Sequence, residues 1–111
     1  MLSESSWTQE IIPNDPNGSI RLCIRTTEMC LGLKAEISYN GIYILAFVSK
    51  KDEKNLTQKW FFDGKKLTNQ SSGPTFCAQA EADNIKMYPC NANEPKQKIE
   101  IDNQIFPMPG K

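Results

Sequence analysis

The stretch QKWFF at residues 58–62 decides the fold, because it returns as QKIEI at residues 97–101. Before each copy the same features follow in the same order: a Gly-containing turn, a short strand, a segment opening on Cys, an apolar run and a polar loop. The period is about forty to forty-six residues, and repeats of this kind are typical of folds whose units close around a shared core. The sequence therefore predicts two similar units, with a third copy beginning at residues 102–106.

Gln58 and Trp60 indicate why this stretch recurs. Strand alternation would place both side chains on one face, so the Trp60 indole can enter the core while the Gln58 amide bonds neighbouring backbone. Ile99 keeps the apolar role in the second copy. We interpret the pair as a device that forms the core, with no ligand role of its own.

Short segments of strand character fill most of the remaining chain. They alternate apolar with polar residues, or form β-branched and aromatic runs too short for a buried helix. The expected strands are residues 19–24, 42–48, 60–62, 85–88 and 99–101. Turn residues separate them at 17–18, 40–41, 63–64, 72–74 and 93–95. This spacing predicts an all-β sandwich or barrel, with a solvated charged loop at 50–55 and a tail at 107–111.

Length and charge exclude several classes of function. A chain of 111 residues has room for one core, and its zero formal charge leaves no basic stripe for nucleic acid. Histidine is absent, which removes Ser-His-Asp and Cys-His catalysis and His-ligated zinc. The acidic residues show no pairing that predicts a hydrolase, so we expect no enzyme and no cofactor. No apolar run approaches the roughly 18 residues of a membrane helix, so we expect no membrane insertion.

The chain has four cysteines, at positions Cys23, Cys30, Cys77 and Cys90. Pairing of Cys77 with Cys90 is favoured because it closes a short loop between two expected strands, which would contribute about 3 kcal/mol. Cys23 and Cys30 would then bridge a hairpin, or both would stay free. In a reducing compartment all four would be small buried apolar residues.

Three Asn-x-Ser/Thr triplets begin at Asn17, Asn55 and Asn69, and would be glycosylation acceptors in a secretory lumen. With the even number of cysteines they favour a secreted or extracellular protein. Residues 1–20 lack the basic start and apolar run of a signal peptide, so we expect Met1 to follow a removed leader.

Residues 83–90, DNIKMYPC, followed seven residues past Cys90 by Gln97, resemble the third strand and Gln-x-Trp region of a ricin-type lectin lobe. The resemblance extends over residues 17–106 and implies a small β-trefoil of the ricin B type with one abbreviated or incomplete lobe. Cys77 and Cys90 fall where that family places its intra-lobe disulfide.

The resemblance also implies how the chain is divided. Lobe one would span residues 17–62 and lobe two residues 63–102. Residues 1–16 and 103–111 would supply the third lobe, by pairing strands around residues 7–11 and 104–106. The whole chain, residues 1–111, would then form a single domain.

In a competent lobe of that family an aromatic ring stacks on a galactose-like sugar, an Asp two residues after the Cys accepts from its hydroxyls, and an Asn-Gln pair completes the contacts. In lobe two the resemblance implies Tyr88 as the ring, Gln79 at the Asp position, and Lys96 beside Gln97 at the Asn-Gln position. With the flanking polar side chains, the candidate ligand-binding residues are Gln79, Lys86, Tyr88, Asn91, Lys96 and Gln97.

In lobe one the resemblance implies Phe47 as the stacking ring, Gly32 at the Asp position, and Thr57 beside Gln58. Neither lobe has the full set. An amide accepts hydrogen bonds less strongly than a carboxylate, and glycine has no side chain to accept them. Sugar binding is therefore expected on lobe two and to be weak.

Two functions of different class follow. The first is a non-catalytic, lectin-like module that binds glycans or glycoproteins through a galactose-type sugar, with affinity raised by multivalency, for instance in a homo-oligomer. The alternative is a trefoil that binds no sugar and acts on a protein partner, as an inhibitor, a cytokine-like ligand or a coat component.

Overall fold

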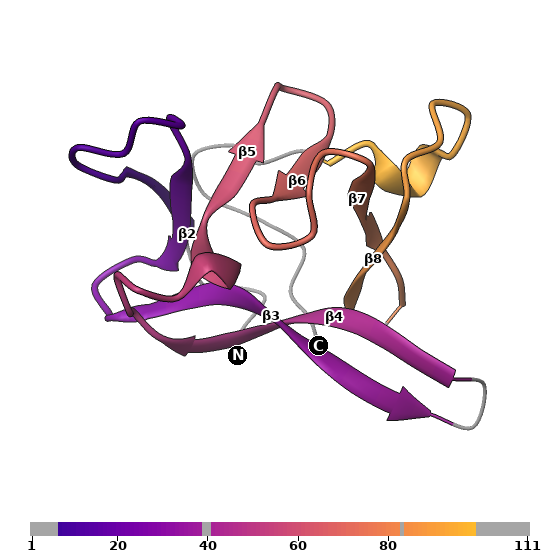
Figure 1. The fold of residues 1–111 in the computed structure, drawn as a ribbon, viewed down its shortest axis with the longest axis horizontal. Coiled ribbons are helices and arrows are strands. Elements are labelled where there is room, and N and C mark those ends of the chain that lie inside the picture. Colours follow the sequence, from indigo (N-terminus) through magenta and orange to yellow (C-terminus); the bar gives the residue numbers. More distant parts are fainter. Residues whose placement is uncertain (1–6, 39–40, 83, 100–111) are drawn as a thin grey trace.

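The computed structural model describes residues 7–38, 41–82 and 84–99. These residues form an antiparallel sheet of eight strands with two short 3-10 helices (Figure 1). The strands are β1 (Trp7–Ile11), β2 (Ile20–Ile24), β3 (Met29–Ser38), β4 (Gly41–Lys50), β5 (Trp60–Phe62), β6 (Leu67–Asn69), β7 (Phe76–Ala80) and β8 (Ile85–Pro89). The helices are η2 (Leu56–Gln58) and η3 (Pro95–Gln97). The predicted all-β class is confirmed.

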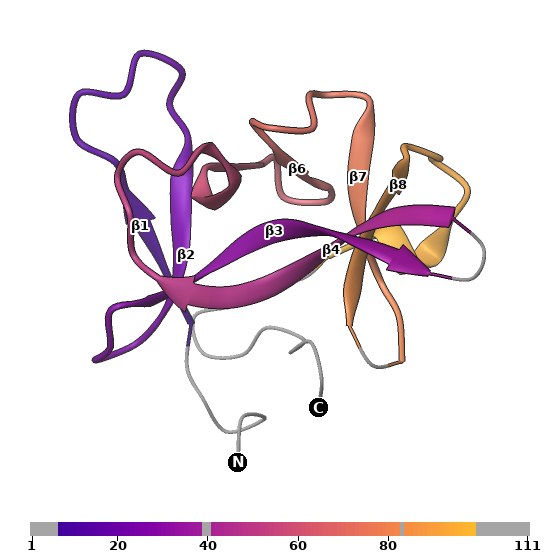
Figure 2. The same cartoon turned by 60° about the horizontal axis from the view of Figure 1, so that its bottom comes forward.

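The sheet curves until it is nearly closed. Its strands follow the order β6-β5-β2-β3-β4-β8-β7, with β1 paired to β2 beside this path. The two ends of the path, β6 and β7, contact each other, which gives the sheet a barrel-like form. In Figure 2 the hairpin of β3 and β4 crosses in front of the other strands.

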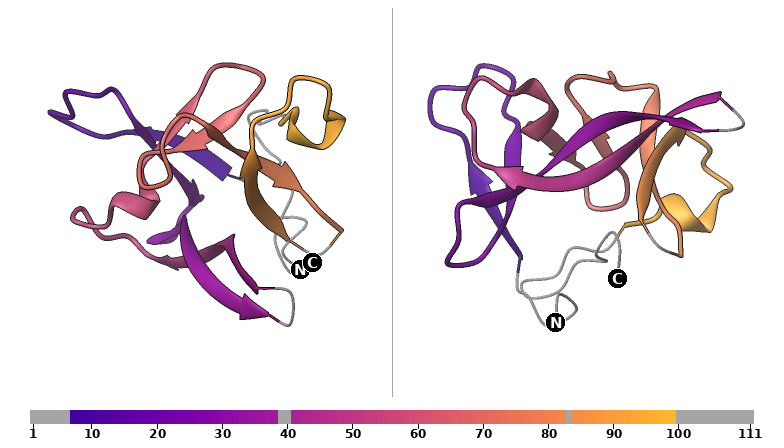
Figure 3. Two further views of the ribbon diagram at one scale, coloured as in Figure 1. Left: turned by 45° about the vertical axis from the view of Figure 1, so that its right-hand side comes forward. Right: turned by 90° about the horizontal axis from the view of Figure 1, so that it is seen from below.

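The hairpin of β3 and β4 is longer than the sequence pattern predicts. Its ten residue pairs run from Met29 with Lys50 to Ser38 with Gly41, and both views of Figure 3 show it extending beyond the rest of the sheet. It meets the second hairpin, β7 and β8, where Leu45 pairs with Lys86. The two hairpins therefore lie side by side.

Strand β1 pairs with β2 along its whole length, from Trp7 with Ile24 to Ile11 with Ile20. The strand expected around residues 7–11 is thus present. Its expected partner, residues 104–106, lies outside the described residues, as do the predicted third copy at 102–106 and the tail at 107–111.

The core draws on both halves of the chain. Trp60 and Leu67 are fully buried at its centre, on adjacent strands. The other buried members of this cluster are Leu22, Leu31, Leu33, Ala46, Ala78, Ile85, Met87 and Ile99. Burial of such side chains contributes about 1.5–3 kcal/mol for each large one, which makes this cluster the main source of stability.

The favoured Cys77–Cys90 disulfide is present, and of the two alternatives for Cys23 and Cys30 the structure has the bridge. Cys23 and Cys30 are direct partners across β2 and β3, with a Cα–Cα distance of 3.9 Å, so this bridge does cross a hairpin. Cys77 and Cys90 join the start of β7 to the residue after β8, with a Cα–Cα distance of 5.0 Å. No cysteine is free.

Candidate functional site

Gln58 holds the loop at residues 51–57 against the end of β4. Its Nε2 donates to the Lys50 carbonyl at 2.9 Å and to Ser49 Oγ at 3.0 Å, and its Oε1 accepts from the Asp52 N–H at 2.9 Å. The residue is 1% exposed. The predicted bonding of this amide to neighbouring backbone is confirmed.

The predicted strand conformation at Gln58 is wrong, because Gln58 ends the 3-10 helix η2. Asn55 caps that helix by accepting from the Thr57 N–H, which favours a helical turn at this point. Trp60 begins β5 and is 0% exposed, with its Nε1 donating to the Leu31 carbonyl at 2.9 Å. Both side chains therefore reach the interior, as predicted, although Gln58 does so from a 3-10 helix and not from a strand.

The second half of the chain repeats this arrangement around Gln97, which ends η3 and is 5% exposed. Its Nε2 donates to the Pro89 carbonyl at 3.1 Å, and its Oε1 accepts from the Asn91 N–H at 2.8 Å. Residues 50, 52 and 58 thus correspond to residues 89, 91 and 97. We call residues 20–62 the first repeat and residues 67–99 the second repeat.

Three of the predicted ligand-binding residues share one face of the second hairpin. Gln79 pairs with Lys86 across β7 and β8, and Tyr88 lies two residues further along β8. All three are partly exposed, whereas Ile85 and Met87, which alternate with them, are buried. Together with Glu81 we call Gln79, Lys86 and Tyr88 the outer face.

Hydrogen bonds join two members of the outer face to each other and to the buried Gln97. Gln79 Nε2 donates to Glu81 Oε2 at 2.8 Å, and Gln79 Oε1 accepts from Gln97 Nε2 at 3.1 Å. Both N–H groups of Gln97 are therefore used inside the protein, one on Pro89 and one on Gln79. Gln97 therefore positions Gln79, and Gln79 in turn positions the partly exposed Glu81 carboxylate.

Lys86 lies against an aromatic ring of the first repeat. Its Nζ is 4.4 Å from the centre of the Tyr43 ring, a cation–π contact. Tyr43 is on β4, close to the pairing of Leu45 with Lys86. The outer face therefore contains one partly exposed tyrosine, Tyr88, and has a second, Tyr43, beside it.

The remaining predicted residues, Asn91 and Lys96, lie on the loop between β8 and η3 and on η3 itself, with exposed side chains. Asn91 Oδ1 accepts from the Asn93 N–H, and the Lys96 N–H donates to Glu94. Asn91 also reaches Gln97 through its backbone. Within the described chain Lys96 makes no side-chain contact to the outer face.

The first repeat does not offer an equivalent face. Gly32 pairs with Phe47 and Cys30 pairs with Ser49, just as Gln79 pairs with Lys86 and Cys77 with Tyr88. Ser49, and not Phe47, therefore occupies the position of Tyr88. The Phe47 ring is instead 5.3 Å from the Lys34 Nζ.

Gly32 is covered by the helix η2. A Cβ at this position would lie 3.0 Å from Thr57 Oγ1 and 3.3 Å from Gln58 Cγ. The first repeat therefore closes over the position that Gln79 occupies in the second repeat.

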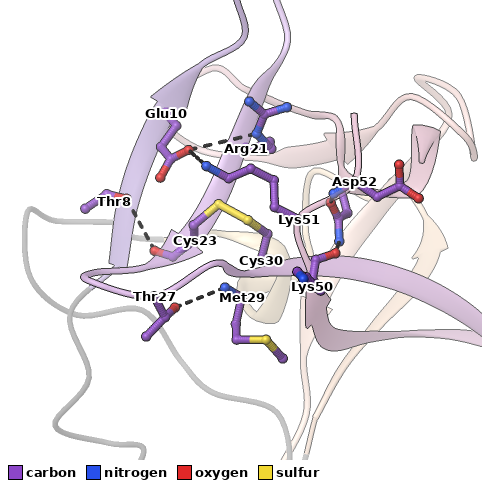
Figure 4. Close-up of polar contacts among 11 residues, drawn as sticks. Thr8, Glu10, Arg21, Cys23, Thr27, Met29, Cys30, Lys50, Lys51 and Asp52 are labelled. Atoms are coloured by element: carbon purple, nitrogen blue, oxygen red, sulfur yellow. Dashed lines mark hydrogen bonds and ion pairs between the residues drawn. A yellow bond between two sulfur atoms is a disulfide. The ribbon is translucent and has the colours of Figure 1, made fainter. Parts of the chain in front are cut away.

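Lys51 occupies the position that corresponds to Cys90. Because Cys30 is bonded to Cys23, this position is free to carry a charge, and Lys51 Nζ lies 3.0 Å from Glu10 Oε1 on β1 (Figure 4). Arg21 Nε lies 3.9 Å from the same carboxylate oxygen. These charges join β1 to the first repeat, which is a structural role.

Two carboxylates support turns, and each has a lowered pKa. The Ser19 hydroxyl, with the Ser19 N–H, lowers the pKa of Asp15 by donating to its carboxylate. The backbone N–H groups of Lys66 and Lys65 lower the pKa of Asp63 in the same way, at 2.8 and 2.9 Å. Both groups stay ionised at neutral pH.

Two members of the site region were not predicted. Glu81 follows Gln79 by two residues, so strand alternation could have placed it on the same face. Tyr43 reaches Lys86 only because two hairpins distant in the sequence pair with each other, and no local pattern signals that pairing.

Among the described residues no group of three or more potential ligand side chains could hold a metal ion. None of the helical segments in this part of the chain has the length and apolarity of a membrane span.

Comparison of the chain with protein-family models, with curated proteins and with solved structures found no match.

Proposed function

We propose that this protein is a non-catalytic, secreted, lectin-like module of the β-trefoil type that binds a galactose-type sugar weakly on the outer face of its second repeat. The observation that carries the proposal is that Tyr88 lies on the same face of the second hairpin as Gln79, which is hydrogen-bonded to Glu81. An aromatic ring can stack on the apolar side of a sugar while a carboxylate accepts from its hydroxyls. Glu81 thus replaces the carboxylate that position 79 lacks.

The topology supports a trefoil with a third, reduced unit. Strand β5 closes the first repeat by pairing with β2, and it also pairs with β6, the first strand of the second repeat. Strand β1 pairs with β2 in the same way that β5 pairs with β6. In this proposal β1 is the closing strand of the third unit. Secretion is supported by the complete pairing of the cysteines in two disulfides.

The test is titration of the full chain with galactose, lactose and N-acetylgalactosamine, followed by NMR of the Tyr88 ring and backbone amides. We expect weak binding, with Tyr88→Ala and Glu81→Gln each weakening it by about tenfold, since loss of one such contact is worth about 1.4 kcal/mol. Phe76→Ala is the matched control, because Phe76 is an exposed aromatic on the same hairpin but outside the outer face. Equal effects of Tyr88→Ala and Phe76→Ala would contradict the proposal.

The second candidate is a module that binds a protein and no sugar. It is favoured by one observation, that both N–H groups of Gln97 are consumed by Gln79 and Pro89 and cannot reach a sugar. This function predicts no response to any sugar and a stoichiometric protein partner whose capture is insensitive to competing saccharides.

A further inference from the structure

A cleft of about 850 Å³ lies between the turn at residues 63–66 and the loop at residues 91–98, both at the top of Figure 1. The Cys77–Cys90 disulfide contributes to its lining. Its volume is in the range that accommodates a small ligand. Of the residues that the sequence singles out, Asn91, Gln97 and the two cysteines line this cleft.

Hydrogen bonds fix both walls of the cleft. On one wall Asp63 Oδ1 accepts from the N–H groups of Lys65 and Lys66, and the Asp63 N–H donates to the Lys66 carbonyl. On the other wall Gln97 Oε1 accepts a hydrogen bond from the Asn91 N–H, and the disulfide to Cys77 fixes Cys90. The walls are joined directly, since the Ile99 N–H donates to the Lys65 carbonyl at 2.8 Å. A cleft with fixed walls loses little entropy when a ligand binds.

The charges of the lining are unbalanced in favour of cations. Lys65 and Lys66 come from one wall and Lys98 from the other. The lining acids, Asp63 and Glu94, already accept backbone N–H groups with their carboxylates. Within residues 7–38, 41–82 and 84–99, none of the three lysines forms an ion pair with either acid. An anion at the mouth of the cleft could therefore be contacted by ammonium groups from both walls.

The cleft is connected to the outer face through Gln97. Gln97 and Asn91 line the cleft, and Gln97 also donates to Gln79 of the outer face. A saccharide bound over Tyr88 would therefore extend toward the lysines.

From this arrangement we infer that the cleft binds the acidic group, a sulfate or a carboxylate, of an anionic saccharide. The inference rests on the proposed sugar-binding function and gives it a substrate class. Lys65, Lys66 and Lys98 would donate charge-assisted hydrogen bonds to the acidic group, while the neighbouring neutral ring lies on the outer face.

The test measures binding of the full chain to three hexasaccharides by calorimetry at 50 and 300 mM NaCl. Chondroitin 4-sulfate carries sulfate and carboxylate, hyaluronan carries carboxylate only, and chitohexaose is neutral. We expect the acidic saccharides to bind at least tenfold more tightly than chitohexaose at 50 mM, with most of the difference lost at 300 mM through screening. Comparing the two acidic saccharides separates sulfate from carboxylate as the group recognised.

The decisive variant is Lys65→Gln with Lys98→Gln, which removes one cation from each wall. Its matched control is Lys50→Gln with Lys54→Gln, which removes the same charge from exposed positions away from the cleft. We expect the first pair to weaken binding of the acidic saccharide by about tenfold and the control by less than twofold. Equal weakening by both pairs, or no preference for acidic saccharides, would overturn the inference.

Tyr88→Ala separates this inference from the proposed function. If neutral sugars bind and respond to Tyr88→Ala while acidic groups add nothing, the function stands and the cleft inference fails. If the acidic saccharides respond to the lysine pair but not to Tyr88→Ala, the cleft binds anions and the proposed outer-face site fails.

Discussion

At the residue scale, Gln58 and Gln97 are the same device used twice, each joining a strand end to the loop that follows it. Replacing Gln58 by leucine would leave the Lys50 carbonyl and the Asp52 N–H without their partner. Because these two hydrogen bonds are partly buried and unpaired backbone groups there are costly, we expect a loss of about 2–4 kcal/mol in the free energy of unfolding by urea. Gln9→Leu, at an exposed position on β1, is the control and should change stability by less than about 0.5 kcal/mol. Similar losses for both variants would contradict the bracing role of Gln58.

Asp15 and Asp63 make the stability depend on pH in a defined direction. Hydrogen bonds lower both pKa values in the folded protein, so the carboxylates stabilise the fold above the unfolded pKa of about 3.9. This contribution is lost as the pH falls through the lowered folded pKa values. We expect the melting temperature to decrease below about pH 4, and to decrease less steeply in the double variant Asp15→Asn, Asp63→Asn. Parallel curves for the two proteins between pH 5 and 2 would show that these carboxylates do not contribute.

The three Asn-x-Ser/Thr triplets differ in their surroundings. Asn69 is 1% exposed, and its Nδ2 donates to the Thr57 carbonyl at 2.7 Å, so a glycan there is incompatible with the fold. Asn17 is exposed in the turn before β2. After secretion from a eukaryotic cell we expect enzymatic deglycosylation to alter the mass of the peptide containing Asn17 and not that containing Asn69. A glycan on Asn69 of the folded, secreted protein would refute this assignment.

At the element scale, the two disulfides differ in the length of chain that they close and in the strands that they join. Cys77–Cys90 closes a separation of 13 residues and Cys23–Cys30 one of 7, for which chain entropy predicts about 3 and about 2.4 kcal/mol. Cys23 and Cys30 also remain neighbours through strand pairing after the bond is lost. Urea unfolding of the two Cys→Ala pairs should therefore show the larger loss for Cys77→Ala with Cys90→Ala. The reverse order would mean that native strain, and not chain entropy, governs these bonds.

The same elements show how far sequence reasoning reaches. The strands at residues 60–62 and 85–88 could be predicted, because apolar alternation and turn residues are local signals. Strand β3 is absent from the expected strands, because charged residues after Leu33 interrupt the apolar run and the pairing with β4 determines its length. The helix η2 depends on capping by Asn55. Interpreting Gln58 and Trp60 by strand alternation misses this helix.

The candidate site divides in the same way. Gln79 and Tyr88 are assigned by the resemblance to a ricin-type lobe, with Lys86 as a flanking polar side chain, and the pairing of β7 with β8 brings all three to one face. The lysine-lined cleft could not be predicted, since its walls, residues 63–66 and 91–98, are distant in the sequence and are joined by the hydrogen bond from the Ile99 N–H to the Lys65 carbonyl. The assignment of Phe47 to the position of Tyr88 is wrong, because the register of β3 with β4 cannot be deduced from the sequence of either strand alone.

At the scale of the whole molecule, the two repeats share one core and cannot be separated. The buried cluster takes Leu31 and Trp60 from the first repeat and Ile85, Met87 and Ile99 from the second. Each hairpin alone would expose its apolar face to water, which is unfavourable for so small a unit. The outer face also depends on this union, because Tyr43 and Lys86 belong to different repeats.

A shared core predicts a single cooperative unfolding transition. In urea, we expect the fluorescence change of Trp60, measured in a Trp7→Phe background, to coincide with the loss of protection of the Met87 amide in hydrogen exchange. Leu67→Ala, at the centre of the core, should lower both midpoints together, with a loss of about 2–5 kcal/mol. Ile11→Ala, at an 82% exposed position, is the control and should leave both midpoints nearly unchanged. Exchange of the Met87 amide at urea concentrations where Trp60 remains buried would mean that the second repeat opens on its own, and that the outer face and the cleft can be lost without global unfolding.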